Sequence, residues 1–360
     1  MILAADIGGT NTSLALFEWT TERVDPIRQE RFHSADYKAL EDILDEFLHR
    51  PAASEAERNP TDEDTVPSAA MEERETSAAS EALTIDAACI GVAGPVINNQ
   101  SRTTNLPWVI DGATIGQRFD IPQVQLLNDL EATAYGLFLL RAEELFVLNA
   151  GSPPKGKQAM ALIAAGTGLG ESILFWDGTR YQPMPSEGGH SDFAPNSDIE
   201  IDLLRHLRGS YLHVSYERVV SGPGLHAIYE YLRDTKKNEP TWLAEKIKIE
   251  DPAATIAQAG LKGEAEIAKQ ALELFASIYG AEAGNLALKA LALGGVYLGG
   301  GIAPKLLAKL RDGTFMRGFT NKGRYKRLMN SIPVKVILNN QTALLGAASV
   351  AGRLAAADKS

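Results

Sequence analysis

Three glycine-rich segments, each placed directly after a short apolar run, constrain this chain more than any other feature. They are Asp6–Asn11 (DIGGTN), Ala165–Gly170 (AGTGLG) and Leu298–Ile302 (LGGGI). Glycine lets the backbone turn sharply and lets amide N–H groups approach an anion without obstruction. A hairpin turn also needs glycine for structural reasons alone, so one such turn is weak evidence. Three of them, two carrying threonine, favour a bound nucleotide.

None of these turns has the spacing of the common nucleotide-binding motifs. The chain contains no GxxxxGK[ST], and no GxGxxG opens a helix after a strand. The hydroxyls of Thr10, Thr12 and Thr167 can donate hydrogen bonds to phosphate oxygens. The sequence therefore predicts a phosphate site made of glycine turns and threonine hydroxyls.

Apolar runs and helical periodicity alternate along the chain. The predicted strands cover residues 2–6, 13–19, 87–92, 124–127, 159–165, 171–176, 296–298 and 333–338. The predicted helices cover residues 37–49, 129–140, 198–207, 223–232, 253–261, 264–293 (with room for a kink at Gly280 or Gly284), 304–310 and 343–356. This alternation favours α/β layers. Segments 2–19 and 159–176 share a strand, a glycine turn and a strand, as a duplicated two-lobed architecture would.

The negative charge is concentrated in one stretch. Of the formal net charge of −11, −7 lies between Pro51 and Thr84, where nine acidic residues accompany two arginines and no aromatic residue. Such a segment cannot bury enough apolar surface to offset its ordering entropy. We expect a flexible acidic insertion, either a tolerated surface loop or a regulatory segment. An acidic chain has no general attraction to nucleic acid or anionic lipid, so neither is an expected partner.

Cysteine usage and hydropathy indicate the compartment. The one cysteine, Cys89, excludes an intrachain disulfide and a four-cysteine zinc site. The first residues, MILAADIGGT, lack the basic region of a signal peptide, and no apolar run approaches the ~20 residues of a transmembrane helix. We expect a cytoplasmic protein.

Six motifs follow one another along the chain. They are DIGGTN, LLND, AGTGLG, SEGGHSDFAP, YERVVSGPGL and LGGGIAP, at residues 6–11, 126–129, 165–170, 186–195, 216–225 and 298–304. In this order they resemble the motif series of bacterial glucokinases, members of the actin/hexokinase/heat-shock-ATPase superfamily. The resemblance runs from Ile2 to about Val350, with Ser13 where many relatives have a basic residue. A related kinase and repressor family with a cysteine-rich zinc motif is disfavoured, because Cys89 is alone.

This resemblance implies a fold and an activity. The fold is a two-lobed ribonuclease-H-like (actin/hexokinase) α/β fold, with a cleft between a smaller and a larger domain. The smaller domain would comprise residues 1–139 and 341–360, including the acidic insertion 51–84, and the larger one residues 140–340. The activity is glucokinase: phosphorylation of D-glucose by MgATP at the 6-hydroxyl, the first step of glycolysis. The resemblance also implies a homodimer.

Phosphoryl transfer to an alcohol needs a carboxylate that orients the hydroxyl and accepts its proton. Asp129 suits this role at a strand's end, although Asn128 and Asp129 are also good helix N-cap residues. From residue types alone, Glu187 is equally a solvated loop acid and His190 a structural histidine. The resemblance makes Asp129 the base, and it makes Asn128, Glu187, His190 and Glu217 ligands of the sugar.

Asp6 directly precedes a predicted phosphate-binding turn, where a carboxylate repels ATP unless a cation intervenes. It would orient the hydration shell of Mg²⁺, or it would accept hydrogen bonds from the amides of its own turn. The resemblance assigns the phosphates and the nucleoside to the three glycine turns. The phosphate ligands are Gly8, Gly9, Thr10, Asn11, Gly166, Thr167 and Gly168, and Gly299, Gly300 and Gly301 flank the nucleoside.

Other function classes stay open to different degrees. These motifs barely distinguish a glucokinase from a broader hexokinase that acts on fructose or mannose. A catalytically silent, sugar-responsive regulator is disfavoured because Asp129 and the three glycine turns are all present. A filament-forming actin-like ATPase would have no use for the segment Ser186–Pro195.

Overall fold

The computed structural model describes residues 1–18, 23, 25–49, 83–103, 106–236 and 238–357. The chain divides into two compact units, Met1–Leu127 with Ala347–Ser360 (unit 1) and Asn128–Gly346 (unit 2). The predicted boundaries at 139/140 and 340/341 stay predictions; unit 2 as found begins at Asn128. The predicted acidic insertion 51–84 lies outside the described residues, apart from Leu83 and Thr84.

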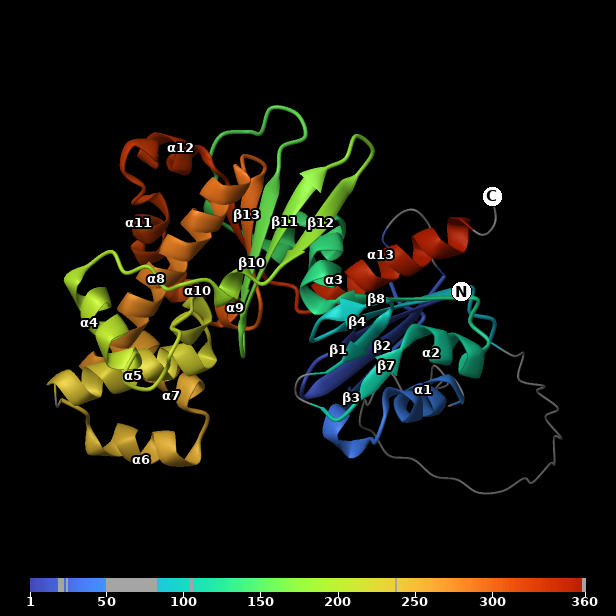
Figure 1. Ribbon diagram of the computed structural model, residues 1–360, viewed down its shortest axis with the longest axis horizontal. Coiled ribbons are helices and arrows are strands. Elements are labelled where there is room, and N and C mark those ends of the chain that lie inside the picture. The colour runs from blue at the N-terminus through green and yellow to red at the C-terminus, as the bar shows by residue number, and fades with distance from the viewer. Residues whose placement is uncertain (19–22, 24, 50–82, 104–105, 237, 358–360) are drawn as a thin grey trace, which may run out of the picture. The chain divides into compact units, whose positions relative to one another are not determined.

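Unit 1 is built on a five-stranded sheet in the order β3-β2-β1-β4-β8 (Figure 1). β1 pairs antiparallel with β2 and parallel with β4. Nearly every residue of β1 and β4 is buried, which explains their continuous apolar sequence, because parallel strands are covered on both faces. The strands are β1 (Ile2–Ile7), β2 (Asn11–Phe17), β3 (Arg28–His33), β4 (Ala87–Val92) and β8 (Gln123–Asn128).

Helices α1 and α2 and a second, small sheet also belong to unit 1, together with the part of α13 (Thr342–Ala357) that begins at Ala347. Helix α1 (Leu40–His49) buries an apolar stripe at helical spacing, and the ring of Phe47 packs edge-on against that of Phe32. Helix α2 (Gly112–Phe119) is capped by Asp111, whose carboxylate accepts from two backbone amides. The small sheet has the order β5-β6-β7, with β5 (Val96–Ile97), β6 (Gln100–Arg102) and β7 (Val109–Asp111).

Unit 2 contains a six-stranded sheet in the order β12-β11-β10-β13-β14-β9. Its first four strands repeat the pattern of unit 1: β10 pairs antiparallel with β11 and parallel with β13. This repetition agrees with the duplicated architecture that the sequence suggests. The strands are β9 (Leu145–Asn149), β10 (Met160–Ala165), β11 (Leu169–Trp176), β12 (Tyr181–Ser186), β13 (Gly295–Gly299) and β14 (Val334–Ile337).

The helices of unit 2 pack mainly around α8 (Glu266–Ala290), the long orange helix beside α5 and α11 in Figure 1. A Cβ on Gly280 would lie 2.0 Å from the Phe315 carbonyl oxygen, and one on Gly284 would lie 2.6 Å from that of Phe319. These glycines therefore let α11 approach the backbone of α8 closely. The other helices are α4 (Asp198–Leu207), α5 (Gly222–Lys236), α6 (Thr241–Ile249), α7 (Pro252–Lys262), α9 (Ile302–Lys305), α10 (Leu307–Leu310), α11 (Thr314–Thr320) and α12 (Lys326–Ser331).

Helix α3 (Asp129–Gly136) is fixed by close backbone contacts within unit 2. A Cβ on Gly136 would lie 1.9 Å from the Thr342 carbonyl oxygen, and one on Gly346 would lie 1.8 Å from that of Ala132. The partner of α3 here is the beginning of α13 (Thr342–Ala357). On its other side, α3 packs against β11 and β12. Helix α3 therefore lies against β12, the strand that leads into the segment with Glu187 and His190.

The predicted α/β class with two sheet-bearing parts is confirmed. Several local predictions are wrong. The helix predicted at 129–140 ends at Gly136 and continues as a short 3-10 turn, and the one predicted at 304–310 is two short helices that meet at Leu306. The prediction also omits α2, α6, α11, α12 and most edge strands, because short elements carry too few apolar positions to show a period.

Candidate active site

Asn128 ends β8 and Asp129 begins α3, as the LLND motif predicts. The side chain of Asn128 accepts from the backbone N–H of Leu130 at 2.9 Å, and Asp129 Oδ1 accepts from the same N–H at 2.8 Å. Leu130 is buried in a cluster with residues of β10, β11 and β14. Asn128 is thus the N-cap, and the Asp129 carboxyl group is held at the N-terminus of a helix.

The segment after β12 forms a tight turn, the 3-10 helix η5 (Gly188–His190). The Ser186 hydroxyl accepts from the Gly188 N–H at 2.9 Å. A Cβ on Gly189 would lie 2.0 Å from the Leu169 carbonyl oxygen, so only glycine fits against the start of β11. The turn leaves the side chains of Glu187 and His190 largely exposed, at 82% and 58%.

Glu217 comes from a different part of unit 2, the 3-10 helix η6 (Tyr216–Arg218). Its Oε2 accepts from the backbone N–H of Leu169 at 3.0 Å, and a Cβ on Gly168 would lie only 2.5 Å from the same oxygen. The second glycine of AGTGLG is therefore needed to admit this carboxylate. The beginning of β11 supports both the η5 turn and Glu217.

The imidazole of His190 lies between two carboxylates. Its Nε2 is 4.0 Å from Glu187 Oε2, and its Nδ1 is 3.9 Å from Glu217 Oε1. Carboxylates accept hydrogen bonds and a ring N–H donates one, so this group can bind several sugar hydroxyls. The structure brings together three of the five sugar-site residues that the sequence predicts.

Asp129 is electrostatically linked to this group. Burial raises the pKa of the Asp129 carboxyl group, and the negative charge of Glu187 raises it further, against the opposing effect of its hydrogen bonds. A carboxylate with a raised pKa is a stronger base than a solvated aspartate. All five predicted sugar-site residues lie in unit 2.

The glycine turns of unit 2 also lie together. The Gly222 N–H donates to the Gly166 carbonyl at 2.9 Å, which fixes the AGTGLG turn to the start of α5. Gly300 has a φ of +77°, and a Cβ there would lie 2.3 Å from the Ala165 carbonyl oxygen. A Cβ on Gly166 or Gly301 would meet no atom within 4 Å. The predicted phosphate turn and nucleoside turn are thus neighbours, and both have open space beside them.

The third glycine turn lies in unit 1, between β1 and β2. The Gly8 N–H donates to the Asn11 carbonyl at 2.9 Å, which closes the turn, and Thr10 at its tip is exposed. The prediction that Thr12 binds phosphate is wrong: its side chain is fully buried and its hydroxyl hydrogen-bonds that of Ser34 at 3.0 Å. The roles predicted for Asp6, Gly9 and Asn11 stay predictions.

Two positioning contacts escape the sequence analysis. A ring N–H of His213 donates to the His190 carbonyl at 2.9 Å, and the other ring nitrogen lies 3.3 Å from Asp192 Oδ1. The Ser221 hydroxyl donates to the Glu217 carbonyl at 2.7 Å and accepts from the Gly224 N–H at 3.0 Å. Ser221 could have been found because it lies within the YERVVSGPGL motif. His213 lies in no motif, and the sequence analysis predicts only a surface or packing role for it.

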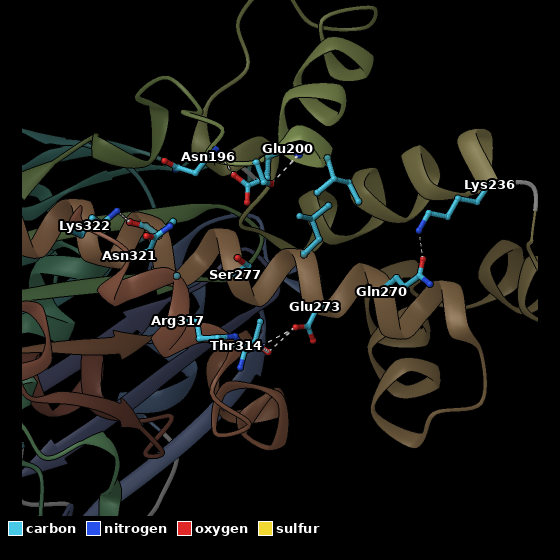
Figure 2. A pocket seen from close by; sticks show the side chains of 15 residues that line it. Asn196, Glu200, Lys236, Gln270, Glu273, Ser277, Thr314, Arg317, Asn321 and Lys322 are labelled. Carbon is cyan, nitrogen blue, oxygen red and sulfur yellow. Dashed lines mark hydrogen bonds and ion pairs between the residues drawn. The ribbon is translucent and has the colours of Figure 1, made fainter. Parts of the chain in front are cut away.

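A separate cavity of about 370 Å³ lies among α4, α8 and α11 of unit 2 (Figure 2). None of the predicted site residues lines it. Its polar side chains already bind one another: Lys236 Nζ reaches Gln270, and Arg317 reaches Glu273 at 3.2 Å. Lys322 lines it too, but donates at 2.6 Å to Asn285 Oδ1.

Comparisons with known proteins agree with the motif series. The family model described as Glucokinase matches residues 3–354. A glucokinase from Nostoc sp. is 40% identical over 369 residues, covering 98% of this chain and 99% of the relative. A crystal structure of glucokinase from an Antarctic psychrotroph superposes with a TM-score of 0.78 at 29% identity, covering 98% of each chain.

A more distant structure shares the fold alone. It is a ROK family glucokinase from Streptomyces griseus in complex with glucose and AMPPNP, 21% identical, with a TM-score of 0.59. The superposition covers 98% of this chain and 99% of that one. Within the described residues, no helix is long and apolar enough to cross a membrane.

Proposed function

The chain belongs to the glucokinase family, and on that premise we propose that it transfers the γ-phosphoryl group of ATP to the 6-hydroxyl of glucose at Asp129. The observation that carries this assignment is the position of Asp129. Its carboxyl group is partly buried at a helix start, its pKa is raised, and Glu187 is near enough to contribute to that shift.

The sugar ligands act by holding the hydroxyls. Glu187 and Glu217 accept hydrogen bonds from sugar O–H groups, and His190 between them donates or accepts. The Asn128 side-chain oxygen accepts from the Leu130 N–H, and the side chain also hydrogen-bonds Asp129, so Asn128 holds the base as well as lying beside the sugar. Fixing the sugar in this way lowers the entropic cost of bringing its 6-hydroxyl to Asp129.

Asp129 accepts the 6-hydroxyl proton as the oxygen attacks the γ-phosphorus in line with the leaving β-phosphate oxygen. Two glycine turns of unit 2, Gly166–Gly168 and Gly299–Gly301, offer backbone groups and open space for the nucleotide. The turn Gly8–Asn11 of unit 1, with its exposed Thr10, has the chemistry of a phosphate-binding turn in its own right.

Magnesium enters as part of MgATP. Among the described residues, no group of three or more His, Cys, Asp or Glu side chains can hold a metal ion. A single carboxylate at Asp6 fits an ion carried by ATP, because Mg²⁺ keeps several waters and takes only one or two carboxylates. Asp6 would then hold the hydration shell of the ion, which would supply positive charge next to the transferred phosphoryl group. The cytoplasmic location and the homodimer stay predictions from the sequence.

A substrate panel tests this function. Purified protein is incubated with glucose, mannose or fructose, each with ATP, ADP or polyphosphate, and ADP and sugar phosphate are measured separately. We expect glucose 6-phosphate from glucose and ATP, and no product from the matched variant Asp129→Asn. Equal efficiency with fructose or mannose would make the protein a general hexokinase, and ATP hydrolysis without sugar phosphate would refute the assignment.

A further inference from the structure

Two buried carboxyl groups lie side by side beneath the sugar site, and the mechanism above does not use them. Glu171 of β11 is 1% exposed and Glu282 of α8 is 0% exposed. The two side chains hydrogen-bond each other. In the part of the chain that the structure describes, no N–H group reaches Oε1 of either residue. Two adjacent buried carboxylates cannot both be ionised, so the pair must share a proton.

The surroundings decide which residue carries that proton. Glu282 Oε2 accepts from Asn285 Nδ2 at 2.8 Å, Lys289 Nζ lies 3.7 Å from Oε1, and the Tyr216 hydroxyl also bonds this carboxylate. These groups stabilise a negative charge on Glu282. Among the described residues no side-chain N–H donates to Glu171, and burial together with the charge of Glu282 raises the pKa of Glu171 to about 8, against the opposing charge of Lys289. Burial also raises the pKa of Glu282, but its donors and Lys289 oppose that rise, so the surroundings favour Glu171 as the protonated member of the pair.

The pair contacts both segments that carry sugar ligands. An ideal Cβ on Gly188 would lie 2.2 Å from Glu171 Oε2, so this oxygen lies directly against the backbone of the η5 turn. Gly188 stands between Glu187 and His190. On the other side, Glu282 bonds Tyr216, the residue before Glu217. A change of charge in the pair acts on both segments at once.

We propose that protonated Glu171 is a positioning residue for glucose: by sharing its proton with Glu282, it holds the η5 turn and Tyr216 in the arrangement that binds the sugar. Ionisation of Glu171 places two negative charges in a site that is closed to solvent, and their repulsion displaces the Gly188 backbone. The proposal rests on the proposed roles of Glu187, His190 and Glu217.

Other titratable groups face the pair, and the experiment must distinguish their titration from that of Glu171. Lys289 and Lys322 are cations on its α8 side, and burial lowers the pKa of Lys322. Tyr216 and Tyr279 contribute hydroxyls whose pKa values burial raises well above their usual range. On the η5 side the nearest charged groups are Glu187 and His190. Because burial shifts the pKa of Lys322 toward lower pH, Lys322 is the alternative source of an alkaline effect that the test must exclude.

The test is the pH dependence of glucose affinity, measured by titration calorimetry from pH 7 to 9.5 without ATP. If only the protonated form binds, the Kd of the unmodified protein rises about tenfold at pH 9, because the competent fraction falls in proportion. Glu171→Gln keeps the volume and a donor toward Glu282 but cannot ionise, so its Kd should stay flat. An alkaline rise that persists in Glu171→Gln would assign the effect to another group, such as Lys322, and overturn the proposal.

A second variant and a measurement without any variant complete the test. Glu282→Gln removes the second carboxylate, so ionisation of Glu171 no longer sets two negative charges against each other, and the alkaline rise in Kd should become much smaller. In the unmodified protein at pH 9, glucose binding should take up about 0.9 proton, read from binding heats in two buffers of different ionisation enthalpy. No proton uptake would refute the proposal even if both variants failed to fold.

Glu187→Gln separates this inference from the site assignment. Unchanged glucose binding by Glu187→Gln would mean that the assigned sugar ligands are wrong, and the proposal would fail with them. If Glu187→Gln loses glucose while Glu171→Gln keeps the normal alkaline rise, the site stands and only the positioning role is refuted. The kcat of Glu171→Gln at saturating glucose and ATP should match that of the unmodified protein at pH 7.5.

Discussion

Replacing Asp129 by asparagine should abolish most turnover without weakening the fold. Asparagine keeps Oδ1, which accepts from the Leu130 N–H at 2.8 Å, and the cap of the helix stays with Asn128. Loss of a general base typically lowers the rate by ~10²–10⁴-fold, which corresponds to about 2.7–5.5 kcal/mol in the activation barrier. Loss of a helix cap would cost only about 1 kcal/mol of stability, and here the cap is retained.

The sign of the stability effect follows from the pKa of Asp129. Because burial raises that pKa in the folded state, the ionised carboxylate destabilises the fold at neutral pH, and this cost grows as pH rises from the unfolded value through the folded one. Asparagine has no charge to bury. The melting temperature of Asp129→Asn should therefore equal or exceed that of the unmodified protein.

Three measurements on one preparation of Asp129→Asn test whether Asp129 is the base. They are kcat from a coupled glucose 6-phosphate assay, the Kd for glucose from calorimetry, and the melting temperature from circular dichroism. We expect a kcat at least ~10²-fold lower, a Kd changed much less, and no loss of thermal stability. Near-normal kcat would show that Asp129 is not the base. A large fall in melting temperature would show that the residue is structural and that lost turnover reflects unfolding.

Three further predictions concern pH, packing and the acidic segment. The kcat should fall on acidification as Asp129 is protonated, with a midpoint above its usual value of 3.8; a midpoint at or below 3.8 would exclude Asp129 as the titrating group. Gly189→Ala places a Cβ 2.0 Å from the Leu169 carbonyl oxygen, so it should cost about 1–3 kcal/mol of stability and raise the KM for glucose. The control Gly222→Ala, whose new Cβ would have its nearest neighbour 3.6 Å away, should change neither the stability nor the KM. Equal KM values for glucose in the two variants would contradict this prediction. Deletion of residues 53–81 should leave the KM values for glucose and ATP unchanged, and a loss of activity in a folded deletion protein would indicate a regulatory segment.

Local features of the site are readable in the sequence because they depend on neighbouring residues. The apolar run ending in Asn128 and Asp129 defines a strand followed by a helix start, and the structure confirms both. The glycines of Ser186–Pro195 indicate a tight turn, and η5 is that turn. Thr12 shows the limit of such reasoning: its motif suggests a phosphate ligand, but the alternation of a strand directs its side chain into the core, onto Ser34.

Contacts between distant segments could not be predicted. The sequence gives no reason for His213 to hold the His190 carbonyl, because the two approach only through the fold. From the sequence, Gly280 and Gly284 indicate a possible kink in the long helix. The structure shows instead that they let the backbone of α11 pack closely against α8.

The chain's glycine turns, with the strands and helices that flank them, were determined by the sequence alone, because steric limits on φ and apolar periodicity act over a few residues. Through family motifs, the sequence also determined the activity. Only the tertiary structure decided that Glu171 and Glu282 are buried together, next to the segments that carry the predicted sugar ligands. The physical reason is burial: a carboxyl group's charge depends on which atoms replace water around it, and those atoms come from segments far apart in the chain.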